Sequence, residues 1–143
     1  KNKYHFTYTN YTAFRSEIKK NDLREVYPPK YLSFEKFIRN TSIGTSTMII
    51  KSSSIGNVKF SNTKICEDYF FKCQILKKVN YAYCLQESLT KYRIRKNSLQ
   101  SNKMRNLYWI WHINKNYNQL SFLKNLISIL YISINSMKKY GFK

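Results

Sequence analysis

Residues 67–85, EDYFFKCQILKKVNYAYCL, contain a predicted helix, a break and a predicted strand in one stretch. Apolar residues in this segment fall at helical spacing, with Cys73 and Leu76 three or four positions from the preceding member of the set: Tyr69, Phe70, Cys73 and Leu76. Acidic residues open this segment and lysines close it, and this order of charges complements a helix dipole. Asn80 interrupts the pattern, and the following run YAYCL is typical of a strand. A helix followed directly by a strand favours an α/β fold.

Upstream of this stretch the sequence also predicts alternating strands and helices. YHFTYTNY, residues 4–11, alternates aromatic with polar residues, as a half-buried strand does. The charged segment that follows ends at a Pro-Pro pair and is predicted to be a surface excursion. Ser33 is placed to cap a short helix over residues 34–40. TSTMII, residues 45–50, then predicts a buried strand.

Downstream, the sequence predicts one more strand and then only helices. Residues 89–94 form a second short strand candidate, followed by a loop over residues 95–102. Two helices follow, the second over residues 120–140 with apolar residues on more than half of its circumference. The predicted fold class is α/β, with a mixed sheet, flanking helices and a C-terminal helical extension. We divide the chain into residues 1–101 and 102–143.

The composition is that of a packed protein with a strong positive charge. The 143 residues are 43% hydrophobic and 17% aromatic, which is more apolar than a disordered chain. With 3 Gly and 2 Pro, a flexible linker and a collagen-like rod are excluded. The net charge is +19, but the basic residues are scattered and form no long run of like charge. Nucleic acid is therefore not the expected partner.

Cysteine and histidine positions give no sign of a metal site. The cysteines Cys66, Cys73 and Cys84 form no C-x-x-C pair, and the two histidines lie far from them. We expect a reduced, cytoplasmic setting and no metal bound by this chain. No signal peptide is recognisable. The most apolar stretch, residues 120–140, is interrupted by polar residues and is not expected to span a membrane.

The strongest candidate for chemistry is the acidic pair Glu67 and Asp68. Only one other aspartate, Asp22, occurs in the chain. A carboxylate at a helix N-terminus is stabilised in its ionised form and can act as a general base or bind a cation. Acidic residues are also ordinary at helix starts, where they simply complement the dipole. The residues alone leave both interpretations open.

The order of the segments resembles the C-terminal half of the catalytic domain of family 2 glycosyltransferases of the GT-A type. The resemblance covers nearly the whole chain, and it depends on the succession of five pieces: FTYTNY, YLSFEKFIRNTSIGTSTMIIKSS, ICEDYFFKCQILKK, YAYCLQESLTKYRIRKNSLQSNK and WIWHINKNYNQLSFLKNLISILY. It implies a partial GT-A fold. It also implies transfer of a sugar, with inversion, from a nucleotide-diphosphate sugar to a glycan or lipid-linked acceptor, with an envelope glycan as the expected product.

The same resemblance implies roles for particular residues near the acceptor. Asp68 would be the base that removes the proton from the acceptor hydroxyl. Glu67 would orient the acceptor or, equally, cap the helix. Thr45 and Ser46 lie in the segment that resembles the lining of the acceptor pocket, although a turn leading into a strand explains this segment as well.

On the donor side, the resemblance implies a loop that folds over the bound nucleotide sugar. Tyr92, Arg93 and Arg95 belong to that segment, and Arg93 is the preferred partner of the leaving diphosphate. Both arginines are otherwise explained as solvated residues at the end of an exposed strand. Relatives place a histidine in this loop as a metal contact, and the segment here contains none.

The metal-binding motif of the family is absent from the sequence. In the family an acidic D-x-D motif in the N-terminal half holds a divalent metal, Mg or Mn, that bridges the diphosphate oxygens. No D-x-D occurs here. We therefore expect a C-terminal fragment, inactive alone, of an enzyme whose metal ligands lie mostly in the other half.

The C-terminal helices are expected to contact the acceptor side and the inner face of the plasma membrane. A broad apolar face there is accompanied by basic residues that anionic lipid would attract: Lys115, Lys124, Lys138, Lys139 and Lys143. The alternative is a helix that packs only on its own domain.

A second hypothesis from another class is a small basic α/β module without catalysis that binds RNA or an acidic partner. It predicts basic and exposed aromatic residues on one sheet face. The sequence contains no RNP-like run, GXXG loop or helix-turn-helix signature.

Overall fold

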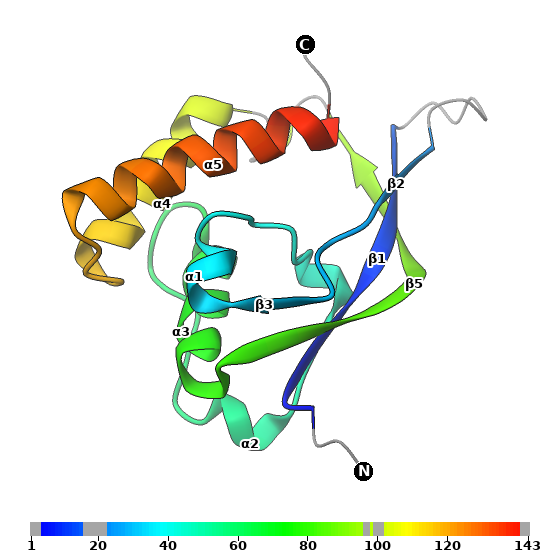
Figure 1. The fold of residues 1–143 in the computed structure, drawn as a ribbon, viewed down its shortest axis with the longest axis horizontal. Helices are drawn as coiled ribbons and strands as arrows, with labels where there is room; N and C mark the ends of the chain where they lie inside the picture. Colours follow the sequence, from blue (N-terminus) through cyan, green and yellow to red (C-terminus); the bar gives the residue numbers. More distant parts are fainter. Residues whose placement is uncertain (1–3, 16–22, 96–97, 99–101, 141–143) are drawn as a thin grey trace.

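A mixed five-stranded sheet organises the molecule (Figure 1). This computed structural model describes residues 4–15, 23–95, 98 and 102–140. The strands are β1 (Phe6–Arg15), β2 (Arg24–Val26), β3 (Tyr31–Ser33), β4 (Met48–Ile50) and β5 (Tyr81–Ile94). The order is β2-β1-β5-β3, and β4 also pairs with β1; only β1 and β5 run parallel among these pairs. The fold is mixed α/β, as predicted, and is compatible with part of a nucleotide-sugar transferase fold.

The helices gather mainly on one side of the β1–β5 pair, with α5 at the periphery (Figure 1). They are α1 (Phe34–Phe37), the 3-10 turn η2 (Thr45–Thr47), α2 (Ser52–Ile55), α3 (Glu67–Val79), α4 (Lys103–Asn116) and α5 (Phe122–Tyr140). Helix α3 occupies the place that its periodicity predicts. Its buried face, which includes Tyr69, Cys73 and Leu76, packs into the main hydrophobic core.

Strand β1 continues to Arg15, beyond its predicted end at residue 11. Phe6, Tyr8 and Asn10 are buried in alternation, and after Asn10 the buried positions become Tyr11 and Ala13. The pairing with β5 shifts register on both sides of Asn10, and the extra residues of this irregularity lie in β5, where Gln86, Glu87 and Leu89 have no partner in the register. Before the shift Phe6 and Tyr8 belong to the main core, and after it Tyr11 and Ala13 belong to a second small core.

Three other elements differ from their prediction. The excursion before the prolines contains β2, which pairs with β1 through Tyr11 and Val26. Only residues 48–50 of TSTMII form a strand, because the backbone N–H and the hydroxyl of Thr47 both donate to the Gly44 carbonyl oxygen and close a 3-10 turn first. The strand is not buried as predicted, since Ile49 is 72% exposed. The two short strands expected over residues 81–94 are one continuous strand, β5, paired along its length with β1.

A buried network of amide side chains joins the C-terminal helices to α3. The Tyr69 hydroxyl donates to Asn114 Oδ1 at 2.8 Å, and Asn118 donates to the same oxygen at 3.1 Å. Asn114 Nδ2 in turn donates to Asn125 Oδ1 at 3.1 Å and to Ser128 Oγ at 3.0 Å. All hydrogen-bonding positions of the Asn114 amide are therefore used at the junction of α3, α4 and α5.

Candidate functional site

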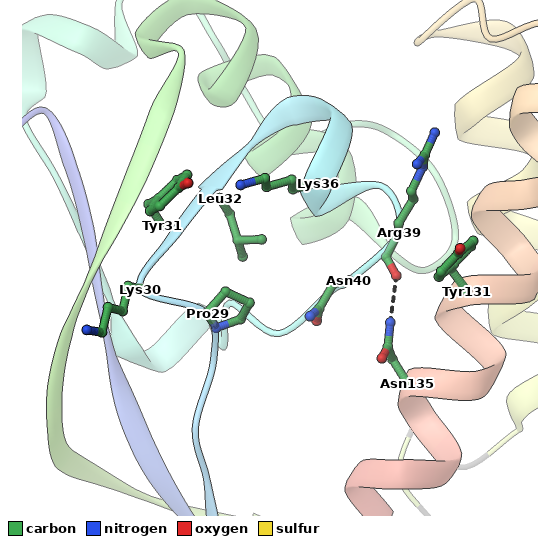
Figure 2. Close-up of a pocket in the computed structure, with 9 residues that line it drawn as sticks. All are labelled: Pro29, Lys30, Tyr31, Leu32, Lys36, Arg39, Asn40, Tyr131 and Asn135. Carbon is green, nitrogen blue, oxygen red and sulfur yellow. Dashed lines mark hydrogen bonds between the residues drawn. The ribbon is translucent and has the colours of Figure 1, made fainter.

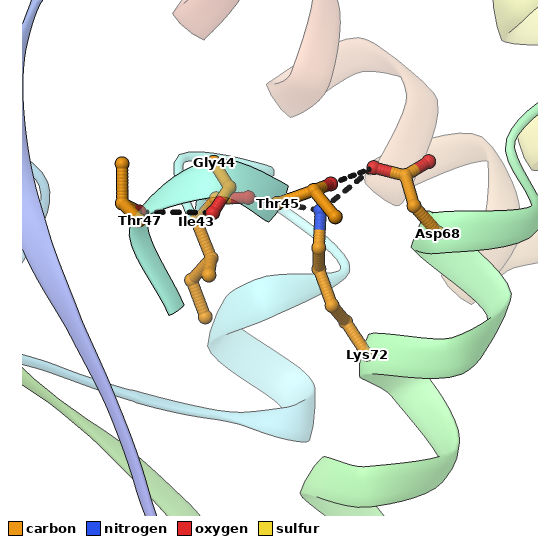
Figure 3. Close-up of polar contacts among 6 residues, drawn as sticks. All are labelled: Ile43, Gly44, Thr45, Thr47, Asp68 and Lys72. Atoms are coloured by element: carbon orange, nitrogen blue, oxygen red, sulfur yellow. Dashed lines mark hydrogen bonds and ion pairs between the residues drawn. The ribbon is translucent and has the colours of Figure 1, made fainter. Parts of the chain in front are cut away.

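Asp68 lies in the first turn of α3, directly opposite the turn η2 (Figure 3). The helix begins at Glu67 after Cys66, whose φ of 64° lies in the left-handed region. Asp68 Oδ2 accepts a hydrogen bond from Thr45 Oγ1 at 2.7 Å and an ion-pair contact from Lys72 Nζ, also at 2.7 Å. The second carboxylate oxygen points away from both donors (Figure 3). Two residues predicted for the site, Thr45 and Asp68, are thus in direct contact.

Lys72 is the central residue of this arrangement, although its sequence pattern alone does not predict a functional role. Its side chain is only 5% exposed, compared with 26% for Asp68. Besides the carboxylate, its ammonium binds the carbonyl oxygen of Ile43 at 3.0 Å. It therefore joins α3 to the segment that leads into η2. The spacing of four residues from Asp68 on a predicted helix was the one signal that could have identified it.

The charge of Lys72 sets the ionisation of Asp68. Burial of the carboxyl group acts to raise its pKa, but the Lys72 charge and the hydrogen bonds from Lys72, Thr45 and the backbone N–H of Tyr69 act against it. The net effect is an Asp68 pKa below its ordinary value. The carboxylate is therefore ionised at neutral pH and able to accept a proton, and its position is fixed by the side chains of Thr45 and Lys72 together with the backbone N–H of Tyr69.

Glu67 and Ser46 flank this contact from the two sides of the site. Glu67 precedes Asp68 at the start of α3, and Ser46 follows Thr45 in η2. Both side chains are exposed. The structure thus brings four of the predicted acceptor-side residues to one surface region.

The predicted donor-side residues lie elsewhere. Tyr92 and Arg93 belong to β5 and not to a loop, because their backbones pair with β1 opposite Ala13 and Phe14. The Tyr92 ring packs edge-on against Tyr11, with centroids 5.8 Å apart, in a second small core. Arg93 and Arg95 are exposed at this end of the strand. Most of the loop expected after Arg95 lies outside the described residues.

The described residues do not fit a divalent metal at this site. Within residues 4–15, 23–95, 98 and 102–140 no three His, Cys, Asp or Glu side chains converge as metal ligands would. Asp68 has the Lys72 ammonium as its neighbour, where a metal site would need further oxygen ligands. We therefore derive no chemical step through a metal from these residues.

The chain is similar over most of its length to a bacterial protein named as a glycosyltransferase. It is 27% identical over 134 residues to the protein named "Putative teichuronic acid biosynthesis glycosyltransferase TuaG" of Bacillus subtilis (strain 168). The match covers 94% of this chain and 53% of that protein, so the chain spans about half the length of this relative. No family model and no solved structure matches the chain. A match of this length includes the whole segment from Thr45 to Lys72.

None of the helices in the described part of the chain has a segment long and apolar enough to cross a bilayer.

Proposed function

We propose that this chain is the acceptor-binding part of an inverting glycosyltransferase of the GT-A type, family 2, that acts in the synthesis of a cell-envelope polysaccharide. The single observation that carries the proposal is the Asp68 carboxylate, held by Thr45 and Lys72 through one oxygen while the other faces away. The similarity to a protein named as a teichuronic acid biosynthesis glycosyltransferase supports it.

The proposed reaction uses Asp68 as a general base. The acceptor hydroxyl gives its proton to the carboxylate, and its oxygen forms a bond with the anomeric carbon of a nucleotide-diphosphate sugar. The bond between that carbon and the diphosphate oxygen breaks, and its electron pair leaves with the diphosphate. Attack from the opposite face inverts the anomeric configuration. The base must be ionised and rigidly placed for this step, and the contacts of Asp68 favour both conditions.

Other residues have supporting roles in this proposal. Glu67 and Ser46, exposed beside Asp68, would hydrogen-bond to the acceptor sugar. Arg93 and Arg95 would approach the leaving diphosphate, and Tyr92, packed on Tyr11, would fix the end of β5 that carries them. The divalent metal that the resemblance implies would be held by residues other than those described here.

The test is the pair of variants Asp68→Asn and Glu67→Gln in the full-length protein that contains this chain. Release of nucleotide diphosphate would be measured against a panel of sugar nucleotides with an envelope-glycan acceptor. General-base catalysis contributes roughly 100- to 10,000-fold, so Asp68→Asn should lower turnover by that range. Glu67→Gln serves as the matched control and should have a much smaller effect. Equal turnover of Asp68→Asn and wild type, with both folded, would refute the assignment of the base.

We also propose that α5 rests on an anionic membrane surface. Phe122 and Leu123 are 72% and 65% exposed, and the stripe continues at intervals of one turn through Leu126, Leu130 and Ile134. Residues 88–143 contain no Asp or Glu. An exposed apolar stripe among basic residues is what an interfacial helix presents to anionic lipid.

Flotation with phosphatidylglycerol vesicles tests this contact. Leu130→Asp should abolish co-flotation, whereas Leu89→Asp, at a similarly exposed position on β5, should not. Absence of wild-type co-flotation, or equal loss in both variants, would contradict the proposal.

One observation favours the second candidate function, binding of RNA without catalysis. Exposed tyrosines gather where β3 meets β5, with the ring pairs Tyr31–Tyr81 and Tyr4–Tyr83 and the Lys36 ammonium 4.0 Å above the Tyr31 ring. Single-stranded RNA stacks on such platforms. Fluorescence anisotropy with a labelled RNA oligonucleotide separates the candidates, because this function requires Tyr83→Ser to weaken binding and Asp68→Asn to leave it unchanged.

A further inference from the structure

A groove lies between the start of β3, helix α1 and helix α5, away from Asp68 (Figure 2). It consists of a cavity of about 320 Å³ and an adjoining cavity of about 260 Å³. The two share three lining residues, Pro29, Asn40 and Asn135, and we call them together the Asn40 groove. Asp68 lines neither cavity.

Two buried polar atoms in the Asn40 groove have no hydrogen-bond partner among the described residues. The Asn40 side-chain oxygen is one of them, and Asn40 lines both cavities (Figure 2). The hydroxyl of Ser42, which lines the second cavity, is the other, although Ser42 is only 2% exposed. Buried polar groups are normally hydrogen-bonded, so these two indicate that something else supplies their partners.

The rim of the Asn40 groove is basic and aromatic. Lys36 Nζ lies 4.0 Å from the centre of the Tyr31 ring, and the Arg39 guanidinium carbon lies 5.9 Å from the centre of the Tyr131 ring. Lys30 lines the first cavity, and Arg24 and Lys138 line the second. Among the described residues, the one carboxylate that lines either cavity is that of Glu25, which accepts a hydrogen bond from the Tyr27 hydroxyl.

We infer that the Asn40 groove binds a saccharide that carries a carboxylate or phosphate group. The Asn40 amide offers an acceptor and a donor to sugar hydroxyls, and Ser42 offers a further hydroxyl. The rings of Tyr31 and Tyr131 offer faces on which the apolar side of a sugar ring can stack. The basic side chains of the rim neutralise the anionic group of the saccharide.

The position of the groove fits a second contact on the acceptor glycan. Ser42 and Thr45 are three residues apart, a separation that spans at most about 10 Å of chain. One short segment therefore carries both the floor of the groove and the Thr45 hydroxyl that holds Asp68. This inference rests on the proposed function only in taking the saccharide to be part of the acceptor.

The test is nuclear magnetic resonance titration of the ¹⁵N-labelled 143-residue chain at 150 mM salt. The probes are tetragalacturonic acid, glucose 6-phosphate, neutral maltotetraose and inorganic phosphate. We expect the Asn40 side-chain amide signal to shift with an anionic saccharide and to respond at least about tenfold more weakly to maltotetraose and to inorganic phosphate. The first two probes distinguish a carboxylate from a phosphate as the anionic group.

Four variants distinguish a specific saccharide site in the groove from nonspecific attraction of anions to a chain of net charge +19. Lys36→Gln and Asn40→Ala should each weaken the anionic saccharide by about tenfold. The matched controls Lys59→Gln and Asn57→Ala change exposed residues outside the groove and should leave affinity unchanged. The melting temperature of each variant verifies folding.

Three results would overturn the inference. The first is an Asn40 signal that no probe shifts, as expected if only water fills the groove. The second is affinity that falls equally in Lys36→Gln and Lys59→Gln. The third is inorganic phosphate binding as tightly as the saccharides. Asp68→Asn should retain full binding, so failure of the proposed catalysis and failure of the groove remain distinguishable.

Discussion

The ammonium group of Lys72 and the carboxylate of Asp68 lie 2.7 Å apart across one turn of α3. The same ammonium binds the carbonyl oxygen of Ile43 at 3.0 Å, and the same carboxylate oxygen accepts the Thr45 hydroxyl. A single charge pair therefore fixes both the start of the helix and the loop before η2. Stability and placement of the proposed base depend on the same three contacts.

Replacing Lys72 with Met should destabilise the fold by about 2 kcal/mol. The variant loses the ion pair and leaves the Ile43 carbonyl oxygen without its donor, while Asp68 keeps some access to water. The free energy of unfolding in urea measures this loss. Lys64→Met, which changes an exposed lysine, is the control.

A double-mutant cycle shows whether the pair is the cause. Asp68→Asn and Lys72→Met together should cost less than the sum of their separate effects, by about 1 kcal/mol or more, because the first change already removes the partner of the second. Strict additivity would mean that Lys72 stabilises the fold only through its stem and the Ile43 contact.

The lowered pKa of Asp68 predicts a defined dependence of stability on pH. The unfolded chain takes up a proton on this carboxyl group at a higher pH than the folded chain does, so folding is favoured above the unfolded-state pKa of about 4. This contribution is lost as the pH falls through the lower pKa of the folded state. Unfolding free energies of wild type and Asp68→Asn should therefore converge between about pH 5 and pH 2.

The control for this experiment is Glu87→Gln, which removes an exposed carboxylate on β5. The difference in unfolding free energy between Glu87→Gln and wild type should change less over the same pH range. A wild-type advantage over Asp68→Asn that persists undiminished at pH 2 would show that Asp68 stabilises the fold by something other than its charge.

The elements with strong local signals could be predicted, and those set by distant partners could not. The periodicity and charge order of residues 67–79 suffice for α3, and the position of Asp68 at its start follows. Strand β2 has only three residues, and it exists because Val26 meets Tyr11 in the second core. No local pattern contains that contact.

The same limit applies to the site. Thr45 and Asp68 each follow from the sequence separately. The contact between them depends on the left-handed backbone conformation of Cys66, and a cysteine gives no sequence signal for that conformation. Lys72 resembles any other helical lysine in the sequence. The sequence pattern predicts a strand over residues 89–94, and Tyr92 and Arg93 lie in β5 as it predicts, whereas the loop that the family resemblance implies for them is not found there.

The three cysteines should differ in their rates of alkylation. Burial raises the pKa of the Cys73 thiol to about 12, and burial together with the nearby Asp68 and Glu67 charges raises that of Cys66 to about 12. Cys84 also has a raised pKa from burial but is partly accessible. Iodoacetamide at pH 8 should modify Cys84 first, and peptide mass spectrometry reads the order. Early modification of Cys73 would contradict the packing of α3.

The Asn114 network predicts that α4 and α5 unfold together with α3. Asn114 is fully buried and satisfies Tyr69, Asn125 and Ser128 at once, so Asn114→Ala leaves several buried polar groups without a partner. Such groups cost about 1–3 kcal/mol each, and the helices that share them should loosen first. Hydrogen exchange of amides in α3, α4 and α5 should become roughly 100-fold faster, whereas exchange in the β1–β5 pair should change less. His112→Ala, at a half-exposed position in α4, is the control for a general effect of substitution in that helix. If wild-type α4 and α5 already exchange far faster than α3, residues 102–143 form an independent unit and the amide network does not couple them to the sheet.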